Sequence, residues 1–542
     1  MAIVSFPLKE MEALIGRKLS KEDLEERIPM IGVTFEGVEN GNVRFDIFPD
    51  RIDMFSIENF AREIRKFFGI EKGLTRFKVL KSKVSFIIDE SVRHVRPFLG
   101  SALIKNVKLT NEQIALLMQL QEKLHETLGR KRRKVAIGLH DASKVEPPFI
   151  YKAVDPKSVK FVPLDKNEEM DLEEILERHE KGVAYSWILK STEKYPIIVD
   201  AKNNVLSFPP IINAELTRVT EKTREILLDV TGTDAKAVEQ VVNIVCSSFA
   251  ERGCKIYSVL INDKYVPTMK PRKMRLHLNY VNKLLGLNLN EKKVNSLLKR
   301  MGMEYKNGYA LIPCYRYDVM HPIDLVEDIA IAYGYDRFKP RISASLTIAK
   351  RSEEEEFVVH VRELMIAMQL QEVVTMLLTN KEQLFDKMRR KEKVVAETLN
   401  PASKEFSVLR DMLLPSLLKV LYENKHNEYP QKIFEIGKII DEKLNEKTHL
   451  AICITYDEAN YNDVASVIDA LFNALKLNYK LIETNHESFI EGRVANISLN
   501  NTSIGIVGEV HPKVLENFKL EKPVVACEID LTEIRKLLKN SS

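Results

Sequence analysis

Acidic side chains gather in one short stretch of this chain, residues 313 to 338, which reads PCYRYDVMHPIDLVEDIAIAYGYDRF. No cysteine pair and no HxxxH spacing accompany them. Oxygen ligands without His or Cys favour Mg²⁺ or Ca²⁺ over zinc. Acids near a helix N-terminus also interact well with the helix dipole or pair with a neighbour such as Arg316. Spacing alone therefore leaves a cation site and a structural role both open for Asp318, Asp324, Glu327 and Asp328.

A basic run, GRKRRK, is the second stretch whose residue types could serve a chemical function. It follows a helical pattern and precedes a strand pattern, so it lies in a turn. Adjacent cations of this kind neutralise phosphates of a nucleic acid. A solvated turn explains them equally well, so both interpretations stand for Arg130, Lys131, Arg132, Arg133 and Lys134.

A helix must position most of the acidic cluster. Pro322 is typical of a first helical turn, and Gly334 is typical of a helix end. The pattern therefore predicts a helix from Pro322 to about Tyr333, with three of the four carboxylates on one face. Asp318 lies at the end of the preceding strand and reaches the same place.

Changes in strand and helix pattern along the chain predict several domains. The expected fold class is therefore a multidomain α+β protein. Asn40-Gly41 and Asn307-Gly308 each join two short strand patterns and predict hairpins. The third region has helices and a hairpin with winged-helix-like character, and Asn290 is a predicted helix N-cap there. The expected domains are an N-terminal α+β domain at 1–85, an α/β module at 90–265, the helix-hairpin domain at 268–345 and a final domain at 350–542.

Composition describes an ordinary globular chain. Hydrophobic residues make up 45% and charged residues 30% of 542, and the formal net charge is only +4. No strong overall field therefore attracts nucleic acid, and any such contact must be local. The five cysteines form no CxxC pair. The sequence has no signal-peptide pattern and no apolar run long enough to span a membrane. These features favour a cytoplasmic protein without a membrane span.

Motifs along the chain are similar to those of one family. RYDVMHPIDLVEDIAIAYGY resembles the carboxylate-rich domain of the β subunit of phenylalanyl-tRNA synthetase, in its archaeal or eukaryal form. PDRIDMFSIENFAREIR resembles the family's N-terminal signature, and KVAIGLHD, NNVLSFPPIINAELTRV and DVTGTD resemble its editing module. LNPASKEFSVLRDMLLPSLLKVLYENK, KIFEIG and GIVGEVHP resemble its C-terminal catalytic-like domain. The resemblance covers essentially the whole chain, in the expected order.

This resemblance implies a subunit of an α₂β₂ phenylalanine–tRNA ligase that charges tRNA(Phe), with ATP as substrate of the complex. The implied partners are the α subunit and tRNA(Phe). The implied cofactor is Mg²⁺, held by the four carboxylates of the acidic stretch. The C-terminal domain resembles a class II synthetase antiparallel-sheet domain, but residues 350–542 contain no GxGxxxR motif. Aminoacylation is therefore expected on the α subunit.

The resemblance also implies a site that hydrolyses mischarged Tyr-tRNA(Phe), because a hydrophobic pocket discriminates poorly against an added hydroxyl. Asp229 and Thr231 alternate along a strand and should face one side. Turn and helix-capping roles explain the same positions. We interpret His140 as a satisfied loop histidine and His511 as structural. The candidate editing residues are Ser207, Asn213, Asp229 and Thr231.

Two other interpretations remain. A nucleic-acid-binding scaffold protein without editing activity would use the winged-helix-like region, although KVNSLLKR offers few cations for a recognition face. A stand-alone Mg²⁺-dependent hydrolase would need acids that converge from several elements, whereas three of these lie on one helix.

Overall fold

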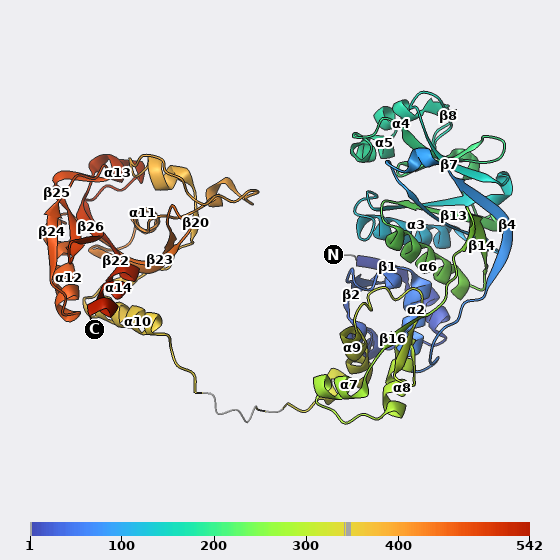
Figure 1. The fold of residues 1–542 in the computed structure, drawn as a ribbon, viewed down its shortest axis with the longest axis horizontal. Coiled ribbons are helices and arrows are strands. Elements are labelled where there is room, and N and C mark those ends of the chain that lie inside the picture. Colours follow the sequence, from blue (N-terminus) through green and yellow to red (C-terminus); the bar gives the residue numbers. More distant parts are fainter. Residues whose placement is uncertain (1–2, 341, 343–347, 542) are drawn as a thin grey trace. The chain divides into compact units, whose positions relative to one another are not determined.

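The computed structural model describes residues 3–340, 342 and 348–541, which form two compact units, Met1–Ile342 and Ser343–Ser542 (Figure 1). Each unit combines helices with β-sheet, so the expected multidomain α+β organisation is confirmed. Among the described residues, no helix is long and apolar enough to cross a membrane.

The N-terminal part of the first unit is a three-stranded antiparallel sheet covered by a helix. Strands β1 (Ile3–Pro7), β3 (Asn42–Ile47) and β2 (Val33–Glu39) lie in that order. Asn40 and Gly41 both have positive φ, as the predicted hairpin turn requires. Helix α2 (Ile57–Phe68) begins where the amide of Asn59 donates to Ser56 Oγ at 3.2 Å, and it ends at Gly69.

A ten-stranded mixed sheet forms the middle of the first unit. Strand β4 (Val79–Ile88) is the first strand of this sheet along the chain, and it alone runs parallel to its neighbours, β7 (Phe149–Val154) and β14 (Lys255–Ile261). Helices α3 (Asn111–Glu126) and α6 (Ala235–Glu251) bury apolar faces in the core of this unit. The remaining strands are β5 (Phe98–Lys105), β6 (Val135–Asp141), β7 (Phe149–Val154), β10 (Tyr195–Val199), β11 (Val205–Phe208), β12 (Ile212–Asn213), β13 (Glu225–Gly232), β14 (Lys255–Ile261) and β15 (Lys264–Val266).

The two ends of this sheet approach each other. β12 begins the strand order and β6 ends it, yet the side-chain amide of Asn213 on β12 donates to the carbonyl of Leu139 on β6 at 3.4 Å. The short helices α4 (Leu172–Arg178) and α5 (Glu180–Tyr185) follow one another in the chain, and the start of α5 lies beside this junction. A hollow therefore forms where the two ends of the sheet meet, and each end supplies one of its walls.

The last part of the first unit joins a small sheet to three helices. Strands β16 (Arg272–Arg275), β18 (Tyr309–Ile312) and β17 (Glu304–Lys306) pair in that order beside α7 (Leu278–Leu285) and α8 (Glu291–Arg300). Asn290 caps α8, accepting from the amide of Lys293 at 2.9 Å. Helix α9 spans Pro322–Tyr333, as predicted.

The second unit is a seven-stranded sheet between two sets of helices. All its pairings are antiparallel except that of β19 (Gln371–Glu372) with β22 (Gln431–Ile440). One face packs against α10 (Glu353–Ala367), α12 (Tyr461–Ala474) and α14 (Leu531–Ser541), and the other against α11 (Leu414–Glu423) and α13 (Pro512–Asn517). After β22 the strand order continues through β23 (Glu446–Thr455), β27 (Val524–Asp530), β26 (Thr502–Val510), β25 (Phe489–Leu499) and β24 (Tyr479–Glu483).

Candidate functional site

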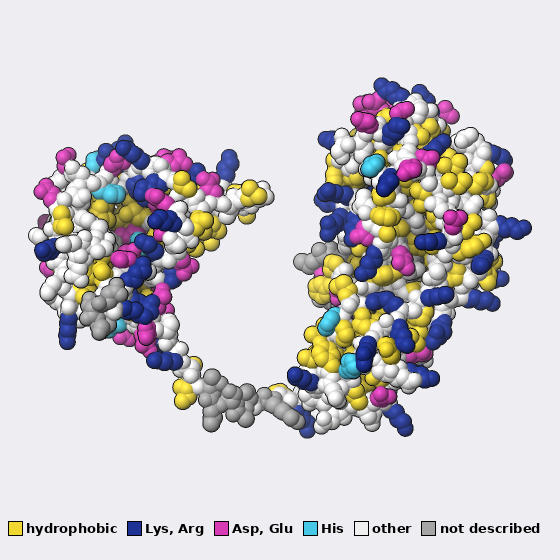
Figure 2. All heavy atoms as spheres, viewed as in Figure 1, with side chains coloured by type: hydrophobic (Ala, Val, Ile, Leu, Met, Phe, Trp, Pro, Cys, Tyr) yellow, Lys and Arg dark blue, Asp and Glu magenta, His cyan; other side chains and the backbone are white. Residues whose placement is uncertain are grey.

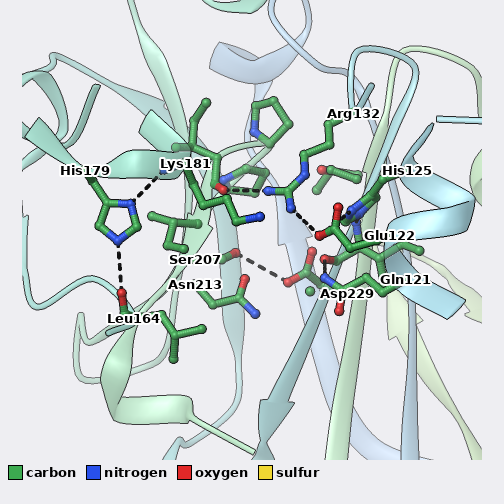
Figure 3. A pocket seen from close by; sticks show the side chains of 18 of the residues that line it. Gln121, Glu122, His125, Arg132, Leu164, His179, Lys181, Ser207, Asn213 and Asp229 are labelled. Carbon is green, nitrogen blue, oxygen red and sulfur yellow. Dashed lines mark hydrogen bonds and ion pairs between the residues drawn. The ribbon is translucent and has the colours of Figure 1, made fainter. Parts of the chain in front are cut away.

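A cavity of about 410 Å³ lies where the ends of the ten-stranded sheet meet (Figure 3). Its walls come from α3, β6, β13, the β11–β12 turn, the start of α5 and the segment around Leu164. This volume falls within the range of small-molecule sites. The cavity brings together all four predicted editing residues, Ser207, Asn213, Asp229 and Thr231.

Asp229 is the carboxylate of the cavity wall and is 2% exposed. It lies on β13 between β5 and β6 and pairs in register with Gly138. Its Oδ2 atom contacts His140 Nε2 at 2.6 Å and accepts from Ser207 Oγ at 3.4 Å. The described residues donate no hydrogen bond to Oδ1 of Asp229, so this oxygen is left for the cavity.

The interpretation of His140 as a loop histidine is wrong. The residue belongs to β6, is fully buried and joins Asp229 to Thr217, whose Oγ1 lies 2.8 Å from His140 Nδ1. Sequence reasoning missed this because the strand continues two residues further than its apolar run. Its imidazole is satisfied, as expected, but one of its partners is a candidate site residue.

Thr231 lies two residues after Asp229 on the same strand, and a buried arginine holds it. Arg96 Nε donates to Thr231 Oγ1 at 2.9 Å, and Arg96 Nη2 donates to the Thr231 carbonyl at 2.7 Å. No carboxylate among the described residues is within ion-pair distance of Arg96. Burial therefore lowers the pKa of Arg96 to about 10, which still leaves the guanidinium charged at neutral pH.

Ser207 and Asn213 lie opposite each other across the Pro209-Pro210 turn, in register on β11 and β12. Ser207 directs its hydroxyl to Asp229, while Asn213 bridges to β6 as described above. The turn therefore closes the cavity and supplies two polar groups to it.

The basic run divides between the cavity and the surface. Arg132 is 6% exposed and lines the cavity, donating to the Ile211 carbonyl at 2.9 Å and to Glu122 at 2.7 Å. Lys134 pairs with Asp234 at 3.1 Å. The other three cations, Arg130, Lys131 and Arg133, are exposed.

Two further cavity residues had no signal in the sequence. Lys181 points into the cavity from the start of α5 (Figure 3), and no carboxylate of the described chain lies within ion-pair distance of its ammonium. His125 accepts from the Ile137 amide at 2.9 Å through Nε2, so its neutral ring carries the proton on Nδ1. Burial lowers the pKa of His125 to about 4 and keeps the ring neutral at pH 7.

The four carboxylates of the acidic stretch serve different partners. Arg316 binds Asp318 at 2.7 Å and Asp328 at 2.8 Å, and this guanidinium is 3% exposed. Burial raises the pKa of Asp328 to about 6, whereas Arg316 overcomes the same effect at Asp318 and lowers its pKa. Asp324 accepts from the amides of Met320 and His321 at 2.7 Å. Glu327 is exposed.

This arrangement does not fit a metal site. Within the described part of the chain, no group of three or more His, Cys, Asp or Glu side chains is placed to hold an ion. Arg316 supplies the positive charge that an ion would bring to two of the four ligands. The Mg²⁺ site therefore remains a prediction from the family resemblance, without support from this geometry.

Buried polar groups of the second unit bind one another. Arg410 pairs with Glu435 at 2.8 Å, and Glu528 accepts from the amide of Leu413 and contacts His449 Nδ1 at 2.8 Å. His511 accepts from the Lys513 amide and caps α13, so its structural role is confirmed. All five cysteines are free thiols.

Comparisons with known proteins agree with this organisation. Residues 105–259 match the B3/4 domain, residues 274–335 the tRNA synthetase B5 domain, and residues 340–531 the phenylalanyl tRNA synthetase beta chain CLM domain. The cavity residues from Glu122 to Thr231 lie in the first of these matches and the acidic stretch lies in the second.

Full-length relatives are named phenylalanine–tRNA ligase beta subunit. The relatives from Archaeoglobus fulgidus and Methanocaldococcus jannaschii are 42% and 41% identical, over 98% of this chain and 98% and 100% of their own lengths. A solved N-terminal fragment of the β subunit from Pyrococcus horikoshii is 40% identical with a TM-score of 0.58, and covers 61% of this chain and 100% of its own. The chain belongs to the family of phenylalanine–tRNA ligase β subunits.

Proposed function

We propose that the cavity hydrolyses tyrosine wrongly attached to tRNA(Phe), while the chain supports ATP-dependent charging by the ligase. The observation that carries this proposal is the Asp229 carboxylate, which is almost fully buried and keeps one oxygen for the cavity. In this reaction water adds to the ester carbonyl and the bond to the terminal ribose breaks, releasing tyrosine and tRNA.

Selectivity for tyrosine follows from the acceptor character of Asp229. Tyrosine differs from phenylalanine by one phenolic hydroxyl, which is a hydrogen-bond donor. A buried acceptor that meets this donor is satisfied by tyrosine and left unpaired by phenylalanine. Such sites discriminate by about 10⁴–10⁵-fold. Oδ1 of Asp229 is an acceptor of this kind.

Cations around the cavity suit the other end of the substrate. Lys181 offers an ammonium that no carboxylate of the described residues pairs with, and Arg132 offers a buried guanidinium beside it. Arg130, Lys131 and Arg133 are exposed on the same turn as Arg132. We assign these groups to the phosphates at the acceptor end of the tRNA, which carry its negative charge.

The remaining assignments rest on the family alone. We propose an α₂β₂ complex with an α subunit that holds the aminoacylation site and its ATP, acting on tRNA(Phe) in the cytoplasm. Mg²⁺ as a cofactor of the complex belongs to the same set of proposals, but no ion is assigned to the four carboxylates, whose geometry does not fit a metal site.

Deacylation of Tyr-tRNA(Phe) and Phe-tRNA(Phe) by the complex of this chain with an α subunit from the same source tests the proposal. Asp229→Ala should lose hydrolysis of Tyr-tRNA(Phe) and keep phenylalanine charging. A wild-type complex that hydrolyses the two substrates at equal rates would refute the editing assignment.

A nucleic-acid-binding scaffold without editing activity is the second candidate. On the face shown in Figure 2, Lys and Arg side chains are spread among acidic and apolar ones rather than collected over one element. One of the five cations of the basic run lines the cavity and another is paired with Asp234. These observations favour a cavity with basic edges over a groove built to follow a duplex.

A further inference from the structure

A hydrogen-bonded chain behind the cavity wall fixes the carboxylate of Asp229. It runs from Thr217 through His140 to Asp229, and all three residues are 2% exposed or less. The three residues come from the segment after β12, from β6 and from β13, so these hydrogen bonds connect the two ends of the sheet. None of this was visible in the spacing of the residues.

Proton positions along this hydrogen-bonded chain follow from Asp229. Its carboxylate can only accept, so His140 Nε2 donates a proton to Oδ2 of Asp229 across 2.6 Å. In a neutral imidazole the opposite nitrogen, Nδ1, is an acceptor, and the Thr217 hydroxyl donates to it at 2.8 Å.

Gly138 leaves the space that this pair occupies. It lies opposite Asp229 in register, and a Cβ atom there would lie 2.2 Å from Asp229 Oδ2 and 2.8 Å from His140 Nε2. His140 is two residues along the same strand and is therefore a diagonal neighbour of Asp229. The backbone of β6 is thus shaped around the contact between these two side chains.

We propose that His140 is a positioning residue of the editing reaction: it holds Oδ2 of Asp229 so that Oδ1 is presented to the hydrogen-bond donor of the bound substrate. This inference rests on the proposed function of the cavity. His140 itself touches no substrate, because it is fully buried behind Asp229. A carboxylate on a rotatable side chain, held on one oxygen, offers the other in one direction only, and such preorganisation governs how well a substrate is oriented.

Four variants of this chain, each assembled with the α subunit, test the inference through kcat/KM for deacylation of Tyr-tRNA(Phe). His140→Leu removes both hydrogen bonds and should lower this value about 100-fold, as a displacement of about 1 Å does. His140→Gln keeps a donor directed at Asp229 and should recover at least a tenth of the wild-type rate. Phenylalanine charging should not change in either variant, which reports that the complex is folded.

Ser101→Ala is the matched control. Ser101 is fully buried, pairs in register with Asp229 from the opposite side, and donates to the Leu228 carbonyl at 2.6 Å. The substitution removes a buried hydrogen bond at the level of Asp229 on β13 without touching the Asp229 carboxylate. Deacylation should therefore stay near the wild-type rate.

Asp229→Asn, the fourth variant, separates failure of the positioning role of His140 from failure of the proposed editing function. If Asp229→Asn loses deacylation while His140→Leu retains it, the positioning role of His140 is refuted and the editing cavity stands. Equal losses in His140→Leu and His140→Gln would also refute it, because they would show a general need for the imidazole's volume. A wild-type complex without Tyr-selective hydrolysis would overturn the proposed function and this inference with it.

Discussion

Replacing Gly138 with alanine changes one methyl group and should disable the cavity. Gly138 has an ordinary negative-φ strand conformation, so the backbone itself accepts alanine. The new Cβ would lie 2.2 Å from Asp229 Oδ2, whereas an ordinary contact needs at least 3.4 Å. Asp229 or His140 must therefore move by about 1 Å, which breaks their 2.6 Å contact.

Two magnitudes follow from this displacement. Overpacking a buried site costs about 1–3 kcal/mol of unfolding free energy. Misplacing a substrate-contacting group by about 1 Å lowers a rate about 100-fold. Gly138→Ala should therefore lose about two orders of magnitude in Tyr-tRNA(Phe) deacylation while the complex still charges phenylalanine, and deacylation assays together with thermal unfolding measure both effects.

Gly100 provides the control for this substitution. A Cβ there would lie 2.8 Å from methyl groups of Val238 and Val242 on α6, and away from the cavity. Gly100→Ala should destabilise the same sheet by a similar amount and leave deacylation unchanged. Full deacylation activity in Gly138→Ala, or an equal loss in Gly100→Ala, would refute the reasoning.

Three other substitutions probe separate parts of the molecule. Lys181→Met should raise KM for Tyr-tRNA(Phe) and weaken its salt dependence, while Lys190→Met, at an exposed lysine outside the cavity, should change neither; equal effects would contradict the assignment. Arg316→Met removes the ion-pair partner of the half-buried Asp318 and the buried Asp328 and should lower the unfolding free energy by about 3–5 kcal/mol in denaturant titrations, and Mg²⁺ should restore more stability to this variant than to wild type. Burial opposes the charged form of His449, but its carboxylate neighbours raise its pKa to about 9 from an unfolded value of about 6.5. Its stabilisation, on the order of 3 kcal/mol, is present below pH 6.5 and lost as pH rises through 9, so the difference in Tm between wild type and His449→Gln should shrink from pH 6 to pH 10.

Local signals in the sequence predicted the elements that carry the sites. Pro322 and Gly334 bound helix α9, and Asn290 caps α8, because such preferences act within one turn of the chain. Alternation placed Asp229 and Thr231 on one face of β13, and both line the cavity. These features depend on neighbours a few residues away, so the sequence alone contains them.

Partners distant in sequence could not be predicted in this way. His140 contacts Asp229 across 89 residues, and the register of β6 against β13 decides this contact. The sequence offered Arg316 as a pairing partner for the acids, but the packing of α9 was needed to show that it also binds Asp328, twelve residues away. Lys181 enters the cavity because of where α5 begins, which no local pattern indicated.

The most direct test of the account is a structure of the complex with a non-hydrolysable analogue in which tyrosine is joined by an amide to the 3′-amino group of adenosine. The account predicts that the phenolic oxygen lies about 2.5–3.0 Å from Asp229 Oδ1, with the adenosine on the side of Lys181 and Arg132. A tyrosine ring bound outside the cavity, or inside it with the phenol directed away from Asp229, would contradict the account.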